Sequence, residues 1–305
     1  MSEPPLGPAT TTRVWLPFLI VTLIWGSTWI VITGQLGVVP PSWSVAYRFA
    51  LGSATMFGFA AWKRVPLRVG RADLLFLLVM GTAQFALNFN FVYRAEQHVT
   101  SGLVAVVFAL LVVPNAIFAR IFFGQGVSRP FLFGSIVALA GMALLFEHEL
   151  EMGARPAAAV GAGIGLTLLG VLSASTANVM QAAGRARRLP MPAMLAWAML
   201  FGAALDAVYA WATAGPPVFE ARFDYVAGLL YLGIVASALA FTLYFNLIRV
   251  IGPARAAYSS VLIPVLAMAF STVFEGYVWA WESALGGAMV LGGLVIALRA
   301  RNPVR

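Results

Sequence analysis

The sequence predicts an all-α polytopic membrane protein of ten transmembrane helices, arranged as two inverted five-helix repeats around a central cavity. Three observations predict this fold: ten long apolar segments, a one-sided distribution of positive charge, and residue patterns that recur in the two halves. The composition agrees, because 61% of the 305 residues are hydrophobic and only 10% are charged. A soluble domain of this length could not bury that much apolar surface in its core.

Ten mostly apolar segments of about 18 to 26 residues follow one another, and each can cross a hydrocarbon layer about 30 Å thick. They run approximately over Val14–Gly34, Trp43–Trp62, Asp73–Tyr93, Val99–Ile121, Pro130–Phe146, Ala158–Ala183, Met191–Ala212, Tyr225–Ile248, Ala254–Phe274 and Trp281–Leu298. The connections are short, so they leave no room for a separate soluble domain. No small-residue cleavage site follows a short apolar region at the start, so we expect the first span to be retained.

Lysine and arginine occupy every second gap between these segments. Fifteen of the 19 lie on the side of the N-terminus, three lie on the other side, and Arg48 lies within a segment. Loops rich in Lys and Arg stay in the cytoplasm, so both termini are predicted to be cytoplasmic. The same loops explain the net charge of +8. They would face anionic lipid, so we expect the bilayer as a partner and no nucleic acid.

The acidic connection at 147–157 divides the spans five and five, and an odd number in each half gives the halves opposite orientations. Gly134 and Gly141 match Gly286 and Gly293 at one constant offset. Leu87-x-Phe89-Asn90 matches Leu243-x-Phe245-Asn246, and Gly26-Ser27-Thr28 resembles Ala174-Ser175-Thr176. The predicted organisation is a cytoplasmic tail (1–13), a first repeat (14–146), an external linker (147–157), a second repeat (158–298) and a basic cytoplasmic tail (299–305). Inverted repeats are typical of secondary transporters, with a site near the membrane midplane.

Several short motifs carry a family resemblance: Trp25-Gly26-Ser27, Tyr47-Arg48-Phe49, the prolines Pro114 and Pro264, and the turn at Glu275-Gly276. The chain resembles the drug/metabolite transporter superfamily, in its ten-helix type built from two EamA-like repeats, over about Val14 to Leu298. Within that group it is most similar to bacterial exporters of amino acids, particularly aromatic ones. The resemblance implies a bacterial inner membrane and export of small metabolites. The acidic residue expected at the end of span four is Gln125 here, which favours a structural role for that position.

Polar side chains near the predicted midplane are candidates for substrate binding, because unpaired polar groups are costly in hydrocarbon. Gln84 and Asn88 lie four residues apart and share one helix face, where their amides suit the carboxylate and ammonium of a zwitterion. Hydrogen bonding between helices is the competing interpretation. Ser237 lies at a similar depth, and Asn178 lies further toward the cytoplasm, where it either closes the cavity or packs.

Aromatic residues and prolines complete the predicted substrate site. Trp25, Phe241 and Tyr244 would give an aromatic lining that suits a flat or methylene-rich substrate, although packing or lipid contact also explains them. Pro114 and Pro264 each remove a backbone donor and free a carbonyl, which suits a hinge or a binding site. Prolines are also simply tolerated in membrane helices.

Arg48 and Asp206 are the unambiguous charges well inside spans, at similar depths in spans two and seven. Burying either charge alone would be expensive, so we predict that they form an ion pair toward the outside, either structural or an external gate. The alternative is that Arg48 extends outward along its span and Asp206 faces a wet vestibule.

The sequence does not favour an intramembrane enzyme. It has no cysteine, both histidines (His98 and His148) lie in predicted outer loops, and no nucleotide-binding or metal-ligand spacing occurs. We therefore expect no catalytic residue, no cofactor and no metal site; a non-transporting scaffold or an enzyme remains a distant alternative.

The predicted function is a secondary exporter of small metabolites, most of all amino acids including aromatic ones. A broad exporter of drugs or cationic toxins is the alternative, although it should prefer an acidic residue at the midplane. Asp206 and Glu275 are the only candidates in the sequence for an acid that couples transport to protons. Both lie outward of the midplane, which favours facilitated export. We expect a small-molecule substrate and a monomer or weak homodimer.

Overall fold

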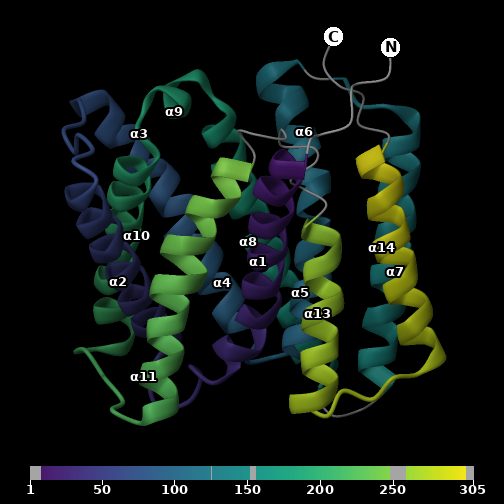
Figure 1. Cartoon of the computed structure of the whole chain (residues 1–305). Helices are drawn as coiled ribbons and strands as arrows, with labels where there is room; N and C mark the ends of the chain where they lie inside the picture. The colour runs from purple at the N-terminus through teal and green to yellow at the C-terminus, as the bar shows by residue number, and fades with distance from the viewer. Residues whose placement is uncertain (1–7, 125, 152–155, 248–258, 300–305) are drawn as a thin grey trace.

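A computed structural model describes residues 8–124, 126–151, 156–247 and 259–299. The remaining parts of the predicted tails, the linker residues 152–155, Gln125 and the start of the predicted ninth span lie outside the described residues. Every described element is a helix, and each of the ten predicted spans contains one (Figure 1). The first predicted tail is already helical from Pro8, and the fifth span continues as helix through Glu151 into the predicted linker.

The helices follow the predicted order. The first half holds α1 (Pro8–Thr33), α2 (Pro41–Trp62), α3 (Arg71–Gly81) with η1 (Thr82–Leu87) and α4 (Asn88–Ala95), α5 (Ser101–Phe108) with η2 (Ala109–Leu111) and α6 (Val112–Phe123), and α7 (Arg129–Glu151). The second half holds α8 (Ala157–Ala182), the short α9 (Gly184–Arg188), α10 (Met191–Ala214), α11 (Phe223–Leu230) with η3 (Tyr231–Leu239), α13 (Ser259–Phe274) and α14 (Trp281–Arg299). After η3 the helix continues to Leu247.

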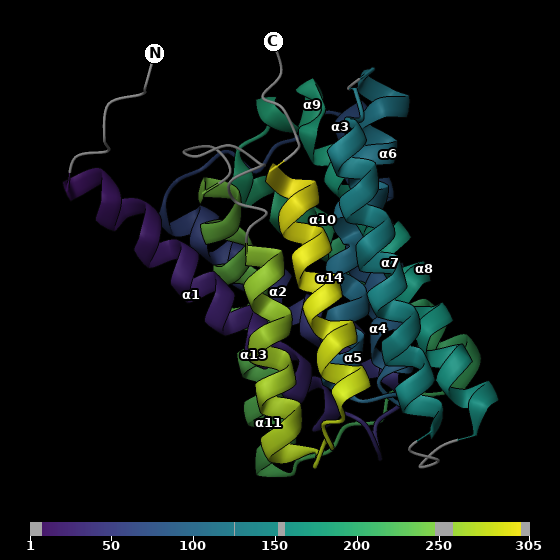
Figure 2. The same ribbon diagram turned by 90° about the vertical axis from the view of Figure 1, so that its right-hand side faces the viewer.

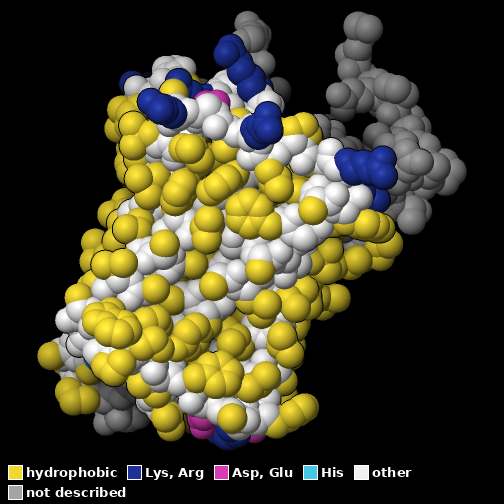
Figure 3. Space-filling model, turned by 90° about the vertical axis from the view of Figure 1, so that its left-hand side faces the viewer, with side chains coloured by type: hydrophobic (Ala, Val, Ile, Leu, Met, Phe, Trp, Pro, Cys, Tyr) yellow, Lys and Arg dark blue, Asp and Glu magenta, His cyan; other side chains and the backbone are white. Residues whose placement is uncertain are grey.

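The protein is an all-α multi-pass membrane protein. Six helical spans among the described residues are both long and apolar enough to cross a bilayer, and three further apolar helices are shorter. The remaining span, α2, has 22 residues and carries Arg48 within it. In the face drawn in Figure 3, hydrophobic side chains cover the middle of the molecule, and the charged side chains gather at its two ends. This distribution fits a hydrocarbon layer around the middle of the bundle.

The two halves interlock rather than lie apart. The most extensive contacts join α7 to α14, α2 to α10, α1 to α13 and α4 to α8, so each pair takes one helix from each half. Figures 1 and 2 both show α7 and α14 side by side at one edge of the bundle. The start of α1 and the end of α14 lie at the same end of the molecule (Figure 2). The opposite end, which holds the turns around Gln35, Glu96, Glu220 and Glu275, is called the far end below.

Glycines allow the close crossing of α7 with α14. A Cβ added to Gly134 would lie 2.5 Å from the carbonyl oxygen of Gly293, and one added to Gly141 would lie 2.5 Å from that of Gly286. The contacts pair the same four glycines that the constant offset picked out. These positions therefore pack spans within one chain. Gly161 and Gly165 differ, because an added Cβ there would meet nothing within 4 Å.

Spans three and eight each contain a π-helical segment in the middle of the membrane, η1 and η3. Close glycine contacts accompany both. A Cβ on Gly202 of α10 would lie 2.5 Å from the Cβ of Phe85 in η1, and a Cβ on Gly52 of α2 would lie 3.2 Å from the carbonyl oxygen of Gly233 in η3. Such widened turns often occur at functional sites, because they leave backbone groups without regular partners.

Candidate functional site

Each residue of Trp25-Gly26-Ser27 in α1 contacts the second half of the molecule. The indole Nε1 of Trp25 donates to the carbonyl oxygen of Ala236 in η3 at 3.1 Å. A Cβ on Gly26 would lie 2.7 Å from the Cβ of Leu266 in α13. Ser27 Oγ and Tyr231 Oη form a hydrogen bond of 2.7 Å. The motif therefore attaches span one to spans eight and nine at the middle of the bundle.

The predicted aromatic residues come together. The ring of Trp25 lies 5.3 Å from that of Phe241 and 4.9 Å from that of Tyr244, measured between centroids. The cluster continues into the first half, because Phe241 lies 5.5 Å from Phe85, and Phe85 lies 4.9 Å from Phe49. Edge-to-face and tilted contacts of this kind stabilise both a core and a bound aromatic ligand. The row crosses the interface between the halves, where a substrate of an inverted-repeat carrier would bind.

The predicted ion pair between Arg48 and Asp206 is not formed in this structure. Arg48 is buried; its Nε donates to Ser237 Oγ at 3.1 Å, and its Nη1 donates to Tyr93 Oη at 3.5 Å. Its guanidinium carbon lies 4.4 Å from the centroid of Phe89, which compensates in part for the lost hydration. The substrate candidate Ser237 thus serves as a partner of Arg48, and it donates in turn to the carbonyl oxygen of Leu232 at 2.8 Å.

Asp206 belongs to a different network. It is buried, and its Oδ1 accepts from Asn90 Nδ2 of α4 at 2.6 Å. Asn90 Oδ1 accepts from Ser42 Oγ at 2.7 Å, and Arg94 Nη2 donates to the same hydroxyl at 3.1 Å. Asp206 therefore reaches a cation only through two neutral side chains. Its second oxygen, Oδ2, is buried and has no hydrogen-bond partner.

Buried polar atoms without hydrogen-bond partners occur in spans one, three and six. Gln84 Oε1 in η1, Trp29 Nε1 in α1 and Ser175 Oγ in α8 are all buried and lack a hydrogen-bond partner. Asn88 donates to the carbonyl oxygen of Gln84 at 3.3 Å, but its own Oδ1 also has no partner. Unpaired groups of this kind are expensive in a dry core. Water or a polar ligand would supply the missing partners.

Three further predicted residues lie outside the aromatic row. Asn178 Nδ2 donates to Asn115 Oδ1 at 3.5 Å, which joins α8 to α6. Pro114 lies in the first turn of α6, three residues after the 3-10 turn η2, and a proline ring displaces the carbonyl one turn before it, which here falls in η2. Pro264 lines an apolar pocket of about 260 Å³ with Val106 and Met268. Pro264 thus lines a crevice among α5, α7, α13 and α14.

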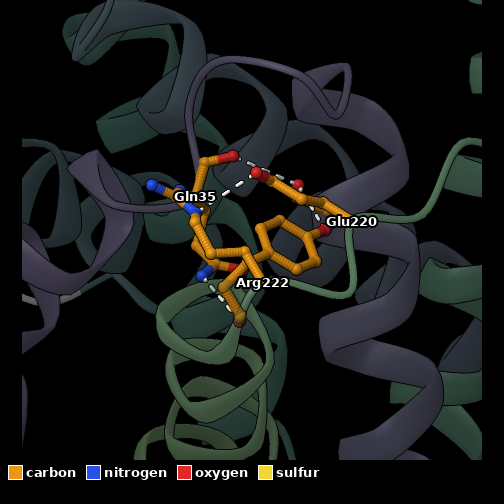
Figure 4. A network of polar contacts seen from close by, with 5 residues as sticks. Gln35, Glu220 and Arg222 are labelled. Carbon is orange, nitrogen blue, oxygen red and sulfur yellow. Dashed lines mark hydrogen bonds and ion pairs between the residues drawn. The ribbon is translucent and has the colours of Figure 1, made fainter.

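The far end is held by polar contacts between the halves. Glu275, at the end of α13, accepts hydrogen bonds from the backbone N–H of Ser101 at 3.2 Å and from Ser101 Oγ at 2.6 Å. Gln35 Nε2 donates to the carbonyl oxygen of Tyr225 at 3.1 Å. Figure 4 shows Gln35 beside Glu220 and Arg222, whose ion pair is 3.2 Å long. These contacts connect the end of the first span and the start of the fourth span to the second half.

Sequence reasoning missed several residues of this region. Phe49 and Phe85 extend the aromatic row, and within the described part of the chain Asn90 alone donates a side-chain hydrogen bond to Asp206. Asn90 was visible in the Leu-x-Phe-Asn pattern but was used only as evidence for a repeat. Glu96 was assigned to a loop, although it lies one turn after Tyr93 and is 4% exposed. No group of three metal-binding side chains occurs among the described residues.

The family of the chain follows from comparison with known proteins. Residues 14–147 and 161–299 each match the EamA-like transporter family. The chain belongs to this family. Its two matched regions correspond to the two interlocked halves, so the resemblance carried by the sequence motifs is confirmed.

Individual relatives are distant but cover nearly the whole chain. The probable amino-acid metabolite efflux pump of Salmonella typhimurium is 24% identical over 298 residues, 94% of this chain and 96% of its own length. Protein PagO of the same organism is 22% identical over 93% of this chain and 92% of its own length. The uncharacterized inner membrane transporter YedA of Escherichia coli is 28% identical over 83% of this chain and 80% of its own length. A solved crystal structure superposes with a TM-score of 0.69 at 22% identity, covering 96% of this chain and 99% of that one, which supports the fold.

Proposed function

We propose that this EamA-family transporter exports small metabolites, in the first place amino acids including aromatic ones, across a bacterial inner membrane by alternating access. The observation that carries the proposal is the interface at mid-membrane. There an aromatic row runs through Trp25, Phe241 and Phe85, and Gln84, which precedes Phe85 in the chain, has a buried Oε1 without a hydrogen-bond partner. An aromatic amino acid has a ring for the first feature and charged hydrogen-bonding groups for the second.

The inverted halves suit alternating access. The glycine crossings of α2 with span eight and of α10 with span three are related by the repeat, so either half can rock against the other with equivalent contacts. One relative, in Salmonella typhimurium, is a probable amino-acid metabolite efflux pump, which agrees with the proposed substrate class. Asn178, Pro114 and Pro264 are proposed to act in the movement of helices rather than in contact with the substrate.

The proposed orientation places both termini in the cytoplasm and the far end outside. Its support is the excess of Lys and Arg on the N-terminal side. The chain has no cysteine, so single cysteines report sidedness cleanly. A membrane-impermeant maleimide added to intact cells should label Gln97→Cys and should label Lys63→Cys only after the cells are opened. The reverse pattern would contradict this orientation. The chain is proposed to work as a monomer or weak homodimer, because its closest glycine crossings are internal.

The direct test is uptake by the purified protein in liposomes. Labelled phenylalanine, threonine and methyl viologen are compared with protein-free liposomes, and each is competed with an excess of unlabelled compound. Saturable entry of phenylalanine, with or without threonine, is the expected result. Entry of viologen alone would show a cation exporter instead. Entry of none of the three would contradict the proposed substrate class.

A further inference from the structure

Glu96 is an unusual carboxylic acid within the far end. It directly follows span three, is 4% exposed, and both of its side-chain oxygens lack a hydrogen-bond partner. A buried, unpaired carboxylate is costly, so the group must be neutral or must have a ligand.

A second acid from the other half lies near it. Glu275 is close enough for its charge to act on Glu96, but it is held differently, because Ser101 donates to it from both its N–H and its hydroxyl. Such donors favour the ionised form. Two neighbouring carboxyls in unlike surroundings divide their roles, and here Glu275 is suited to remain an anion while Glu96 is suited to hold a proton.

Two hydroxyl groups next to the contact between Ser101 and Glu275 also lack hydrogen-bond partners. Ser271, one turn before Glu275, is 0% exposed and its Oγ is unpaired. It lies against the first turn of α5, where a Cβ on Gly102 would be 3.2 Å from that Oγ. Thr100 Oγ1, beside Ser101, is buried and unpaired as well. A protonated carboxyl offers a donor that either hydroxyl oxygen can accept, whereas an ionised carboxylate offers none.

The other charged groups around Glu96 do not neutralise it directly. Arg48 acts on it from α2 but is hydrogen-bonded to Ser237 and Tyr93. Arg94 is bonded to Ser42, Asp206 to Asn90, and the Cβ of His98 lies against α8 at Gly163. His148 contacts the carbonyl oxygen of Val278 at 3.2 Å. Burial raises the pKa of Glu96 well above its usual value; Glu275 raises it further and Arg48 lowers it.

We propose that Glu96 is the proton-binding site of this transporter, and that its proton keeps the contact between Ser101 and Glu275 closed at the external end. The inference rests on the proposed function for its orientation. A proton taken from external water neutralises Glu96 and leaves Glu275 as the only negative charge at the contact. When the pH rises through the raised pKa, Glu96 ionises, two negative charges face each other, and the end opens. Proton entry would then accompany substrate exit.

The test measures opening without any substrate. Nitroxide labels are placed at Gln97→Cys and Val278→Cys, which are exposed residues on either side of the contact in a chain without native cysteine. The distribution of distances between the two labels is measured by double electron–electron resonance spectroscopy from mildly acid to mildly alkaline pH. We expect the population with the long distance to grow with pH relative to the population with the short distance. For one proton, this population ratio rises by at most about tenfold per pH unit. Glu96→Gln should hold the short distance at every pH.

Matched variants decide the outcome. Glu147→Gln removes an exposed acid at the same end and should respond to pH like the unchanged protein. The proposal is wrong if Glu96→Gln retains the response to pH or if the unchanged protein shows none. It is also wrong if sodium at constant pH produces the closure, because the site then binds a metal cation. If no tested substrate entered the liposomes, the proposed function would be rejected. The distance measurement uses no substrate, so it would still test the role of Glu96.

Discussion

Spans three and eight occupy equivalent places in the two halves and agree in backbone, but they differ in the polar side chains around their middle. Both widen into a π-helical segment, η1 and η3, and both meet a glycine contact with a helix of the other half. Span three carries the amides of Gln84 and Asn88 in and after this segment, whereas span eight carries Ser237 and the ring of Phe241. The repeat therefore preserves the helix crossings and not the lining.

This difference has a mechanical reason. A carrier that alternates between two states by exchanging the roles of its halves needs equivalent crossings on both sides of the site. A ligand binds once, in the middle, and one set of polar groups and one set of rings suffices. The scaffold and the lining should consequently respond differently to substitution.

The largest expected effect is in the scaffold. Gly81→Ala in span three would press a Cβ against the backbone of Ala198, which cannot move aside, whereas Gly233→Ala would mainly meet the flexible side chain of Leu51. We expect Gly81→Ala to lower the free energy of unfolding by about 1–3 kcal/mol, as overpacking does, and Gly233→Ala to cost less. Thermal unfolding followed by fluorescent size-exclusion chromatography measures both.

Gly165→Ala is the matched control for these variants. It lies in a membrane helix, but an added Cβ meets nothing within 4 Å. Its stability should stay within about 0.5 kcal/mol of the unchanged protein. Equal stability of Gly81→Ala and Gly165→Ala would contradict a close crossing of α3 with α10.

The next effect separates the linings of the two spans. Gln84→Met removes an oxygen that has no partner, so we expect no loss of stability. Transport of phenylalanine should fall by about tenfold, the loss of one hydrogen bond to a charged substrate group. Ser237→Ala should do the opposite: it leaves Nε of buried Arg48 without its partner and should cost about 1–3 kcal/mol of stability. Unfolding and uptake are measured on each variant.

Either reversal would be informative. A strong loss of stability in Gln84→Met would mean that Gln84 is a structural residue whose partner is a fixed water. Normal stability of Ser237→Ala would mean that Arg48 finds another acceptor.

The sequence predicted the scaffold well because its rules are local or additive. Apolar length and charge asymmetry identify spans and sides regardless of how side chains meet, and glycines at one offset imply a crossing that tolerates no Cβ. The partners of Arg48 could not be predicted this way. Counting residues from the span ends predicts similar depths for Arg48 and Asp206. Hydrogen bonds also depend on how each helix is rotated about its axis, and in the structure Arg48 faces Ser237 while Asp206 faces Asn90.

The same limit hid the acid at the far end. Glu96 stands in a short connection, where a charged residue is normally solvated, but the fold leaves it only 4% exposed. By contrast Trp25, Phe241 and Tyr244 were correctly grouped as aromatic neighbours. Large rings near the midplane of spans one and eight must pack somewhere, and the interface is where those spans meet.

A smaller effect concerns the attachment of span one to η3. Trp25→Phe retains an aromatic ring against Phe241 and Tyr244 but loses the hydrogen bond to the carbonyl oxygen of Ala236. We expect a loss of about 0.5–1.5 kcal/mol in stability and a KM for phenylalanine that changes less than with Trp25→Ala. The control is Trp62→Phe, an exposed ring at the end of α2. Equal KM values for Trp25→Phe and Trp25→Ala would show that the indole N–H, not the ring, matters to the substrate.

The smallest expected effect is the coupling between Arg48 and Asp206, which decides between the sequence-based ion pair and the separate networks of the structure. Arg48→Gln and Asp206→Asn should each destabilise, because each weakens contacts to buried partners. In the double variant the two losses should add within about 0.5 kcal/mol, as they do for residues without a shared partner. Denaturant unfolding in detergent gives the three values. A coupling well above that size would mean that the two charges meet in another state of the transport cycle.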